Sequence, residues 1–292
     1  MKYDIIDKIV TIYSFINNET GEVTTNPVDV IKSLEEQRKS KKTKSNKTTS
    51  EELKTLIFHN LGNFYHLYYD NLPNISRAMK FRFMYLCTFV KLDGYLMQDD
   101  TELKLTKSDI KTKLKLAKAP FYDTYNTFVK QKLISETKNG IKVSKAMCVN
   151  GTIHKYSDSF TRTFNETIRE LYEEHTSYEH ERLGILLDLM KYIHIQSNEL
   201  CFNPTECDVD KIIPMSRKQI LKELGISEKT FAEFMKLKIC NNKQYVVLSI
   251  GTNRSFKYVL NPKISYKGNA IPALQKLIDS HWFVVRTPIL TK

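Results

Sequence analysis

A pattern of apolar residues occurs twice in this chain, and this repeat constrains the fold more than any other feature of the sequence. Each copy begins at a hydroxyl residue that can cap a helix, Thr106 and Ser216, so the copies lie 110 positions apart (216 − 106). The same offset aligns, without a gap, Ile110 with Ile220, Leu114 with Leu224, Phe121 with Phe231 and Tyr125 with Met235. Because residues four apart share one face of a helix, each copy predicts two short helices with a buried face.

The first copy, Leu105 to Gly151, predicts these two helices followed by a β-hairpin. The second helix is expected from Lys118 to Gln131. Its apolar face comprises Phe121, Tyr125 and Phe128. Hairpin strands are expected at 133–137 and 141–144, because Asn139-Gly140 between them tolerates the positive φ angles of a tight turn.

The second copy, Met215 to Gly268, has stronger turn signals and a longer hairpin. Gly225 tolerates a left-handed conformation, and Ser227 can cap the next helix. Its strands are expected at 244–250 and 255–260. The sequence therefore predicts a mainly α fold with small β-hairpins (α+β), containing two winged helix-turn-helix domains in tandem. The alternative is two unrelated α+β segments whose apolar spacing coincides.

The rest of the chain is divided around these two copies. We expect an N-terminal segment and basic linker at 1–50, a first winged-helix domain at 51–156, a connecting helix at 157–181, and a second winged-helix domain with a C-terminal helix at 182–292. Within these parts, helices are predicted at Met79–Leu96, Ser157–Glu174, Arg182–Ile195 and Pro272–Val285, which contains Trp282. Asn63–Tyr69 suits a strand or a short helix, and 98–103 suits an edge strand.

The formal net charge of +12 favours an anionic partner, because lysine and arginine beside phosphates release condensed counterions. An AT-rich genome that encodes many lysines would give the same charge. The polar segment Arg38–Lys47 is expected to be a mobile linker or an arm along a phosphate backbone.

No apolar run is long enough to span a bilayer and the N-terminus carries acidic residues, so we expect a cytoplasmic protein of a bacterial host without membrane contact. Five cysteines without a C-x-x-C pair predict free thiols.

Signals for catalysis are weak, and we expect no enzyme activity, no cofactor and no metal. The chain lacks a G-x-x-x-x-G-K-[ST] loop and has only nine glycines. A metal-dependent nickase needs two histidines around one apolar residue, whereas Ile193-His194-Ile195 has one. His180-Glu181-Arg182 lacks the His-x-x-Arg spacing of a tyrosine recombinase, and the His175–His180 spacing does not match an H-E-x-x-H zinc pair.

In a winged helix, the second helix of the motif enters the major groove and the wing lies over the neighbouring backbone. We therefore expect contacts to double-stranded DNA from the exposed helix faces and wings of both copies; the alternative for each residue is a solvated surface. The candidates in the first copy are Lys107, Lys111, Lys118, Tyr122, Asn126, Lys130, Lys138 and Lys142. Those in the second are Arg217, Lys218, Lys229 and Arg254. Glu228 and Glu233 make the exposed helix face of the second copy partly acidic. This helix is therefore expected to recognise DNA bases less well than the corresponding helix of the first copy.

Two winged units joined by a helix resemble the tandem winged-helix proteins of phages and plasmids from low-GC Gram-positive bacteria, which include replication initiators and regulators. The resemblance rests on Lys80 to Gly151 and Arg182 to Gly268, with the string NFYHLYYDNL before the first unit and Asn261-Pro262 after the second wing. Ala117 departs from it, since a serine cap is expected there. The resemblance implies a DNA-binding protein without catalysis of its own, acting in transcriptional regulation or replication initiation, and leaves these two roles open.

Three further alternatives stay open at this point. A second copy of the chain is a candidate partner, because the apolar stripe of 157–174 can pack within the chain or against a homodimer partner. A tyrosine-recombinase-like strand-exchange protein, or an inactive relative of one, is an alternative function. A protein-interaction module built on winged helices is another.

Overall fold

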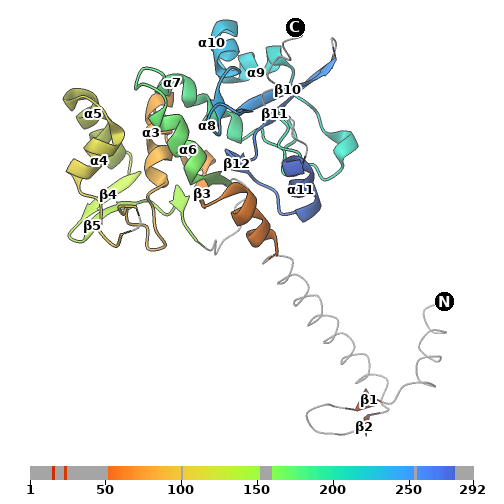
Figure 1. Cartoon of the computed structure of the whole chain (residues 1–292), viewed down its shortest axis with the longest axis horizontal. Helices are drawn as coiled ribbons and strands as arrows, with labels where there is room; N and C mark the ends of the chain where they lie inside the picture. Colours follow the sequence, from red (N-terminus) through yellow and green to blue (C-terminus); the bar gives the residue numbers. More distant parts are fainter. Residues whose placement is uncertain are drawn as a thin grey trace, which may run out of the picture. The chain divides into compact units, whose positions relative to one another are not determined.

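The chain folds into a mixed α+β structure of helices and small antiparallel sheets (Figure 1). The computed structural model describes residues 15–16, 23–24, 52–99, 101–151, 160–252 and 255–279. The chain divides into two compact units, 1–55 and 56–292. In the first, β1 (Phe15–Ile16) pairs antiparallel with β2 (Val23–Thr24). The predictions for Arg38–Lys47, Arg254 and Trp282 fall outside the described residues.

The first copy of the repeat forms the elements that its sequence predicts. Helices α4 (Lys107–Leu114) and α5 (Lys118–Lys130) are followed by a hairpin of β4 (Ile134–Thr137) and β5 (Gly140–Val143). Thr106 caps α4 in a reciprocal capping box, in which its hydroxyl accepts the Asp109 N–H while the Asp109 carboxylate accepts the Thr106 N–H. The two predicted helices and the hairpin are therefore confirmed.

The helix before this copy is shorter than predicted. Helix α3 (Arg77–Cys87) begins at the Ser76 cap and ends well before Leu96. Gly94 has a φ of 85°, which a helix does not allow, and Tyr95 then pairs antiparallel with Lys142 of β5. Met97 pairs in turn with Lys104. The apolar residues after Cys87 suit a buried strand as well as a helix, and pairing with β5 decides between them.

The second copy repeats the order of elements seen in the first. Helices α7 (His180–Leu183) and α8 (Ile185–Met190) precede it, as α3 precedes the first copy, and its own helices are α9 (Arg217–Leu224) and α10 (Glu228–Phe234). Strands β8 (Lys238–Ile239), β9 (Gln244–Tyr245), β10 (Val247–Thr252) and β11 (Ser255–Leu260) follow, and the last two form a hairpin. Glu199 pairs with Val259 of β11, as Tyr95 pairs with β5. The short helix η2 (Val209–Lys211) lies in the loop before α9.

A four-stranded antiparallel sheet draws its strands from segments far apart in the sequence. Its order is β12 (Ser265–Tyr266), β7 (Phe160–Phe164), β3 (Phe64–Tyr68) and β6 (Cys148–Val149). The prediction of one helix over 157–174 was wrong in its first part, because β7 pairs with β3 and helix α6 (Asn165–Glu173) begins only after it. The alternation in FTRTF, which has a period of two, is the signal for this strand. The strand alternative for 63–69 is confirmed, and the short helix η1 (Tyr69–Asn71) follows it.

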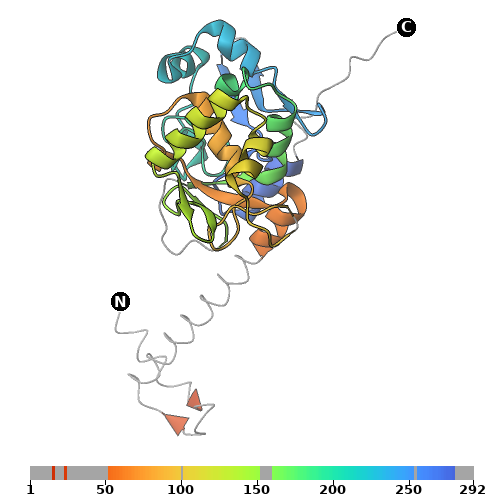
Figure 2. The same cartoon turned by 90° about the vertical axis from the view of Figure 1, so that its left-hand side faces the viewer.

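The two copies meet where α3 packs against α6, α7 and α8; α3 and α6 lie side by side in Figure 1 and in the turned view of Figure 2. At Gly184, between α7 and α8, a Cβ would lie 2.2 Å from the carbonyl oxygen of Arg77. The Arg77 Nε donates to Asp188 of α8 (2.5 Å), and its Nη2 donates to the carbonyl of Leu224 at the end of α9. One cluster of buried apolar side chains includes residues of both copies. Helix α11 (Ile271–Asp279) follows the second copy.

No helix among the described residues has both the length and the apolar character needed to cross a lipid bilayer. All five cysteines are free thiols, and Cys87, Cys148 and Cys201 are buried.

Candidate nucleic-acid interface

Helix α5 has one buried face and one exposed face. The buried face comprises Phe121, Thr124, Tyr125 and Phe128. The exposed face comprises Lys118, Tyr122, Asn126 and Lys130, with Asp123 beside them, and Tyr122 keeps 42% of its surface exposed. Neither Lys118 nor Lys130 forms an ion pair with another described residue. These donors are therefore available to an anionic ligand, whereas their contact with DNA stays a prediction.

Of the two predicted lysines on α4, one is already engaged within the protein. The Nζ of Lys107 lies 4.3 Å from the ring centroid of Tyr125 and 4.0 Å from the Glu136 carboxylate on β4. The Tyr125 hydroxyl donates to the same carboxylate (2.7 Å), and burial together with Glu136 raises the pKa of this tyrosine. Lys111 is half-buried and forms no ion pair with a described residue. Through these contacts with Tyr125 and Glu136, Lys107 connects α4 to α5 and to the hairpin.

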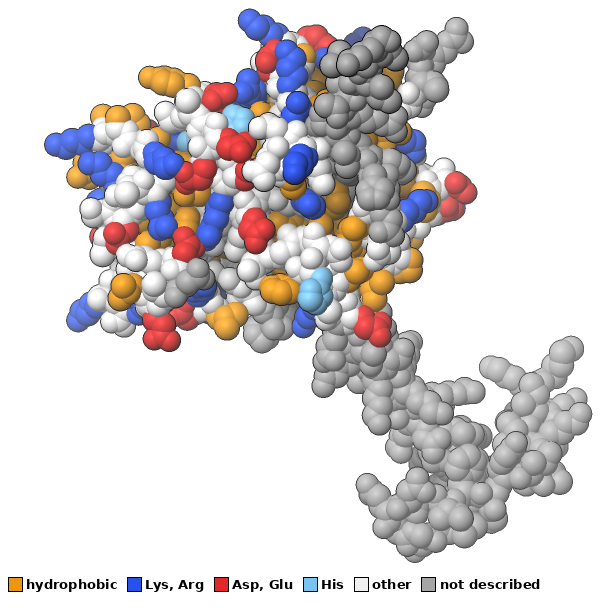
Figure 3. All heavy atoms as spheres, viewed as in Figure 1, with side chains coloured by type: hydrophobic (Ala, Val, Ile, Leu, Met, Phe, Trp, Pro, Cys, Tyr) orange, Lys and Arg blue, Asp and Glu red, His pale blue; other side chains and the backbone are white. Residues whose placement is uncertain are grey.

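The β4–β5 hairpin, which the sequence predicts to be a wing, carries two of the predicted lysines. Lys138 is exposed in the turn, and Lys142 is half-buried on β5 with its Nζ 4.3 Å from the ring centroid of Tyr95. Lys104 approaches the same ring to 4.1 Å. Sequence reasoning missed Tyr95 and Lys104, because it placed Tyr95 inside a helix and did not pair its strand with β5. Figure 3 shows lysine and arginine side chains along the edge where α4, α5 and this hairpin lie, with acidic side chains between them.

The second copy offers fewer available cations on the described residues. Arg217, the first residue of α9, pairs with Glu228 of α10 (2.5 Å), and its guanidinium lies 5.3 Å from the centroid of the Phe231 ring. Lys236 pairs with Glu233 (2.7 Å). Lys218 and Lys229 are exposed. Part of the positive charge of this copy is therefore neutralised by its own carboxylates.

A buried polar chain links α5 to the junction of the two copies, and sequence reasoning did not find it. Arg82 of α3 donates to the hydroxyl of Thr124 on α5 (2.9 Å) and to Nδ1 of His180 on α7 (3.4 Å). His180 is only 2% exposed, and burial together with the Arg82 charge lowers its pKa to about 4. The Tyr172 hydroxyl of α6 donates to the Leu114 carbonyl at the end of α4. These contacts fix α4 and α5 against the rest of the fold.

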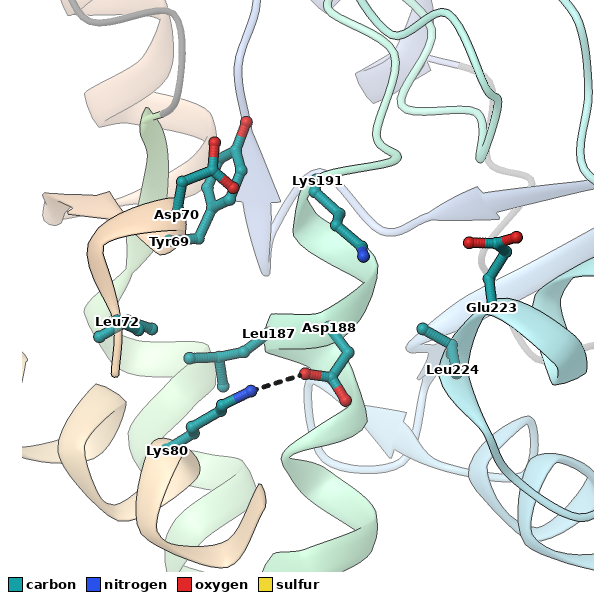
Figure 4. A pocket seen from close by; sticks show the side chains of 9 residues that line it. All are labelled: Tyr69, Asp70, Leu72, Lys80, Leu187, Asp188, Lys191, Glu223 and Leu224. Atoms are coloured by element: carbon teal, nitrogen blue, oxygen red, sulfur yellow. Dashed lines mark hydrogen bonds and ion pairs between the residues drawn. The ribbon is translucent and has the colours of Figure 1, made fainter. Parts of the chain in front are cut away.

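A pocket of about 270 Å³ lies between η1, α3, α8 and α9, and Figure 4 shows the side chains that line it. Its charges have both signs, because Lys80 and Lys191 line it together with Asp70, Asp188 and Glu223. Lys80 pairs with Asp188 (3.1 Å), and Glu223 accepts a hydrogen bond from Tyr192 (2.9 Å). The lining therefore favours no single class of ligand.

The acidic and histidine residues at 173–181 serve structural contacts. Glu173 accepts from the hydroxyl of Tyr85 (2.9 Å) and pairs with Lys115, and Glu181 accepts the N–H of Ala78 (2.9 Å). Across the described parts of the chain, no three histidine, cysteine, aspartate or glutamate side chains come together as a metal site would require.

No protein-family model matches this chain, and no curated protein or solved structure shows significant similarity to it. The functional assignment therefore rests on the residues and their geometry.

Proposed function

We propose that this chain is a sequence-specific, non-catalytic double-stranded DNA-binding protein of a phage or plasmid, acting in transcriptional regulation or replication initiation. In this proposal each copy of the repeat is a winged helix-turn-helix unit. Its support is the order of elements found twice: a helix, an extended segment, two helices with a short turn, and a hairpin whose last strand forms a β-bridge with the extended segment. The short turns carry a left-handed residue at equivalent positions, Lys115 and Gly225.

The observation that carries the proposal is the exposed face of α5. One face of α5 is buried in the core. The other face exposes Lys118, Tyr122, Asn126 and Lys130. An asparagine amide can bind the edge of adenine through two hydrogen bonds, and lysines suit guanine or phosphate. The net charge of +12 adds a favourable field for a polyanion. We assign base reading to α5 and backbone contacts to the second copy, because Glu228 and Glu233 hold cations there.

Selection of binding sites from a pool of random duplexes tests the proposal on the full chain. We expect an enriched motif that binds roughly 10³-fold or more tighter than scrambled DNA, with affinity falling steeply as salt rises. Asn126→Ala should weaken binding to the motif by about 1–3 kcal/mol and relax preference at one base pair, since it removes a bidentate contact. Lys118→Glu should weaken binding to all sequences.

The matched control is Lys211→Gln, which removes an exposed lysine paired with Asp208 far from α5 in sequence. It should leave both affinity and motif unchanged. Equal affinity for all duplexes, or binding insensitive to salt, would contradict the proposal. A protein–DNA adduct that survives denaturation would favour strand exchange, and function that survives Lys118→Glu combined with Asn126→Ala would favour a protein partner.

A further inference from the structure

The outer side of the first wing carries two lysines packed around one tyrosine. The Nζ atoms of Lys104 and Lys142 lie 4.1 and 4.3 Å from the ring centroid of Tyr95. Tyr95 pairs with Lys142 across the sheet, and Met97 pairs with Lys104 on the other side, so three adjacent backbone segments supply the three side chains. The site thus lies on backbone segments that are joined by β-bridges to strand β5 and to each other.

The backbone leaves room for this arrangement at Gly140. A Cβ at Gly140 would lie 3.1 Å from Cδ and 3.2 Å from Cβ of Lys104. The aliphatic part of the Lys104 side chain therefore packs directly against Gly140. Gly140 also has a φ of 121°, which side chains rarely adopt. A larger residue would therefore displace Lys104 from the ring. The hydroxyl of Thr137 donates to the Gly140 carbonyl (2.7 Å) and braces the same turn.

Two ammonium groups held beside one ring repel each other, and neither forms an ion pair with a described carboxylate. Asp93, two residues before Tyr95, uses its carboxylate to accept the Tyr95 N–H (3.1 Å). The hydroxyl of Thr137 and the charges of Lys142 and Lys104 lower the pKa of Tyr95. The local field therefore favours an anion at this point of the surface.

We propose that Tyr95, Lys104 and Lys142 form a binding site for one phosphodiester group of the DNA backbone, beside the bases read by α5. This inference rests on the proposed function and adds to it a defined anchor on the wing. The two lysines provide charge-assisted hydrogen bonds, and cation–π contacts with the Tyr95 ring hold their ammonium groups in place. Because α5 leads into β4 through the hydrogen bond from Leu133 N–H to the Phe128 carbonyl, the anchor sets the position of the reading helix along the duplex.

Phosphate substitution on the selected duplex tests this site with the full chain. Each phosphate in turn is replaced by a neutral methylphosphonate, and affinity is measured by fluorescence anisotropy. For the natural chain we expect one position, or two adjacent ones, at which binding falls about 10-fold. In Lys104→Gln combined with Lys142→Gln, these positions should lose their effect, and the slope of log K against log salt should fall by about 2.

Two companion variants define the role of the ring. Tyr95→Phe keeps the ring and should bind within about twofold of the natural chain, whereas Tyr95→Leu should bind as weakly as the double lysine variant. Lys211→Gln serves as the control for loss of an exposed lysine and should keep the salt slope. Circular dichroism checks that each variant is folded.

The outcomes separate this inference from the proposed function. If Asn126→Ala relaxes the motif while the double lysine variant keeps both its salt slope and its sensitive phosphates, the anchor site is overturned and the DNA-binding function stands. If the natural chain binds no duplex, both are overturned. Binding to duplex with unchanged affinity in Tyr95→Leu also overturns the role of the ring.

Discussion

At the scale of single residues, Arg82 and His180 form a buried polar contact between α3 and α7. Arg82 Nε donates to Nδ1 of His180 (3.4 Å), so this nitrogen must be an unprotonated acceptor. The imidazole is also packed against the rings of Phe81 and Tyr172, at centroid distances of 5.6 and 4.4 Å. Burial and the adjacent guanidinium both disfavour the charged imidazolium, which lowers the pKa of His180 to about 4.

This contact predicts a loss of stability in mild acid. The folded-state pKa of about 4 lies below the ordinary value of 6.5, so between these pH values the unfolded chain binds a proton that the folded chain does not. The stabilisation is complete above pH 6.5 and is lost as the pH falls towards 4, by on the order of 3 kcal/mol. Urea unfolding at a series of pH values should show that His180→Asn is less stable at neutral pH but has a weaker pH dependence. His59→Asn, at an exposed histidine, is the control; equal pH dependence in both variants would contradict the assignment.

At the scale of elements, the two copies use the same helix ends with different residues. Thr106 and Ser216 both cap their helices through capping boxes, with Asp109 and Gln219 as reciprocal partners. The second helices differ, because the Ser227 hydroxyl accepts the Thr230 N–H of α10 (3.1 Å), whereas Ala117 gives α5 no side-chain cap. The helix proposed to read DNA therefore has the less stabilised N-terminus.

This difference predicts opposite effects for exchanged caps. Ala117→Ser should stabilise the protein by about 0.5–1 kcal/mol, because a serine hydroxyl can accept the Ala119 N–H; the next residue, Pro120, has no N–H to donate. Ser227→Ala should destabilise it by a similar amount, because it removes the hydrogen bond at α10. Chemical denaturation of both variants measures the two free energies. A destabilising effect of Ala117→Ser would mean that the backbone at this position does not present its N–H groups as a capped helix does.

Elements with local signals could be predicted from the sequence, and elements set by distant pairing could not. The hydroxyl caps, the apolar faces of α4 and α5, and Asn139-Gly140 act within a few residues, so they indicated the helices and hairpin of the first copy correctly. The strand at Tyr95 and strand β7 depend on partners far along the chain, β5 and β3, and both were predicted as helix. For the same reason the cluster of Tyr95, Lys104 and Lys142 was not visible in the sequence, whereas the exposed face of α5 was.

At the scale of the molecule, the two copies share one core. Helix α3, which precedes the first copy, packs on α7 and α8, which precede the second, and Arg77 donates hydrogen bonds to both Asp188 and the Leu224 carbonyl. Buried apolar residues from both copies belong to one cluster. Since a contact shared by two parts couples their unfolding, the repeat in sequence need not produce two independently folding units.

We therefore expect both copies to unfold in one transition, and Gly184 offers the sharpest test. In Gly184→Ala the new Cβ would lie 2.2 Å from the Arg77 carbonyl oxygen, so α3 must move away from α7 and α8, at a cost of about 3 kcal/mol. Gly225→Ala is the matched control: no described atom lies within 4 Å of its Cβ, and only its left-handed φ of 58° costs about 1 kcal/mol. Hydrogen exchange followed on α5 and α10 should show that Gly184→Ala lowers the protection of both helices equally. Loss of protection in α10 alone, with α5 unchanged, would mean that the copies fold separately and that the shared core does not hold the two proposed DNA-binding units in a fixed arrangement.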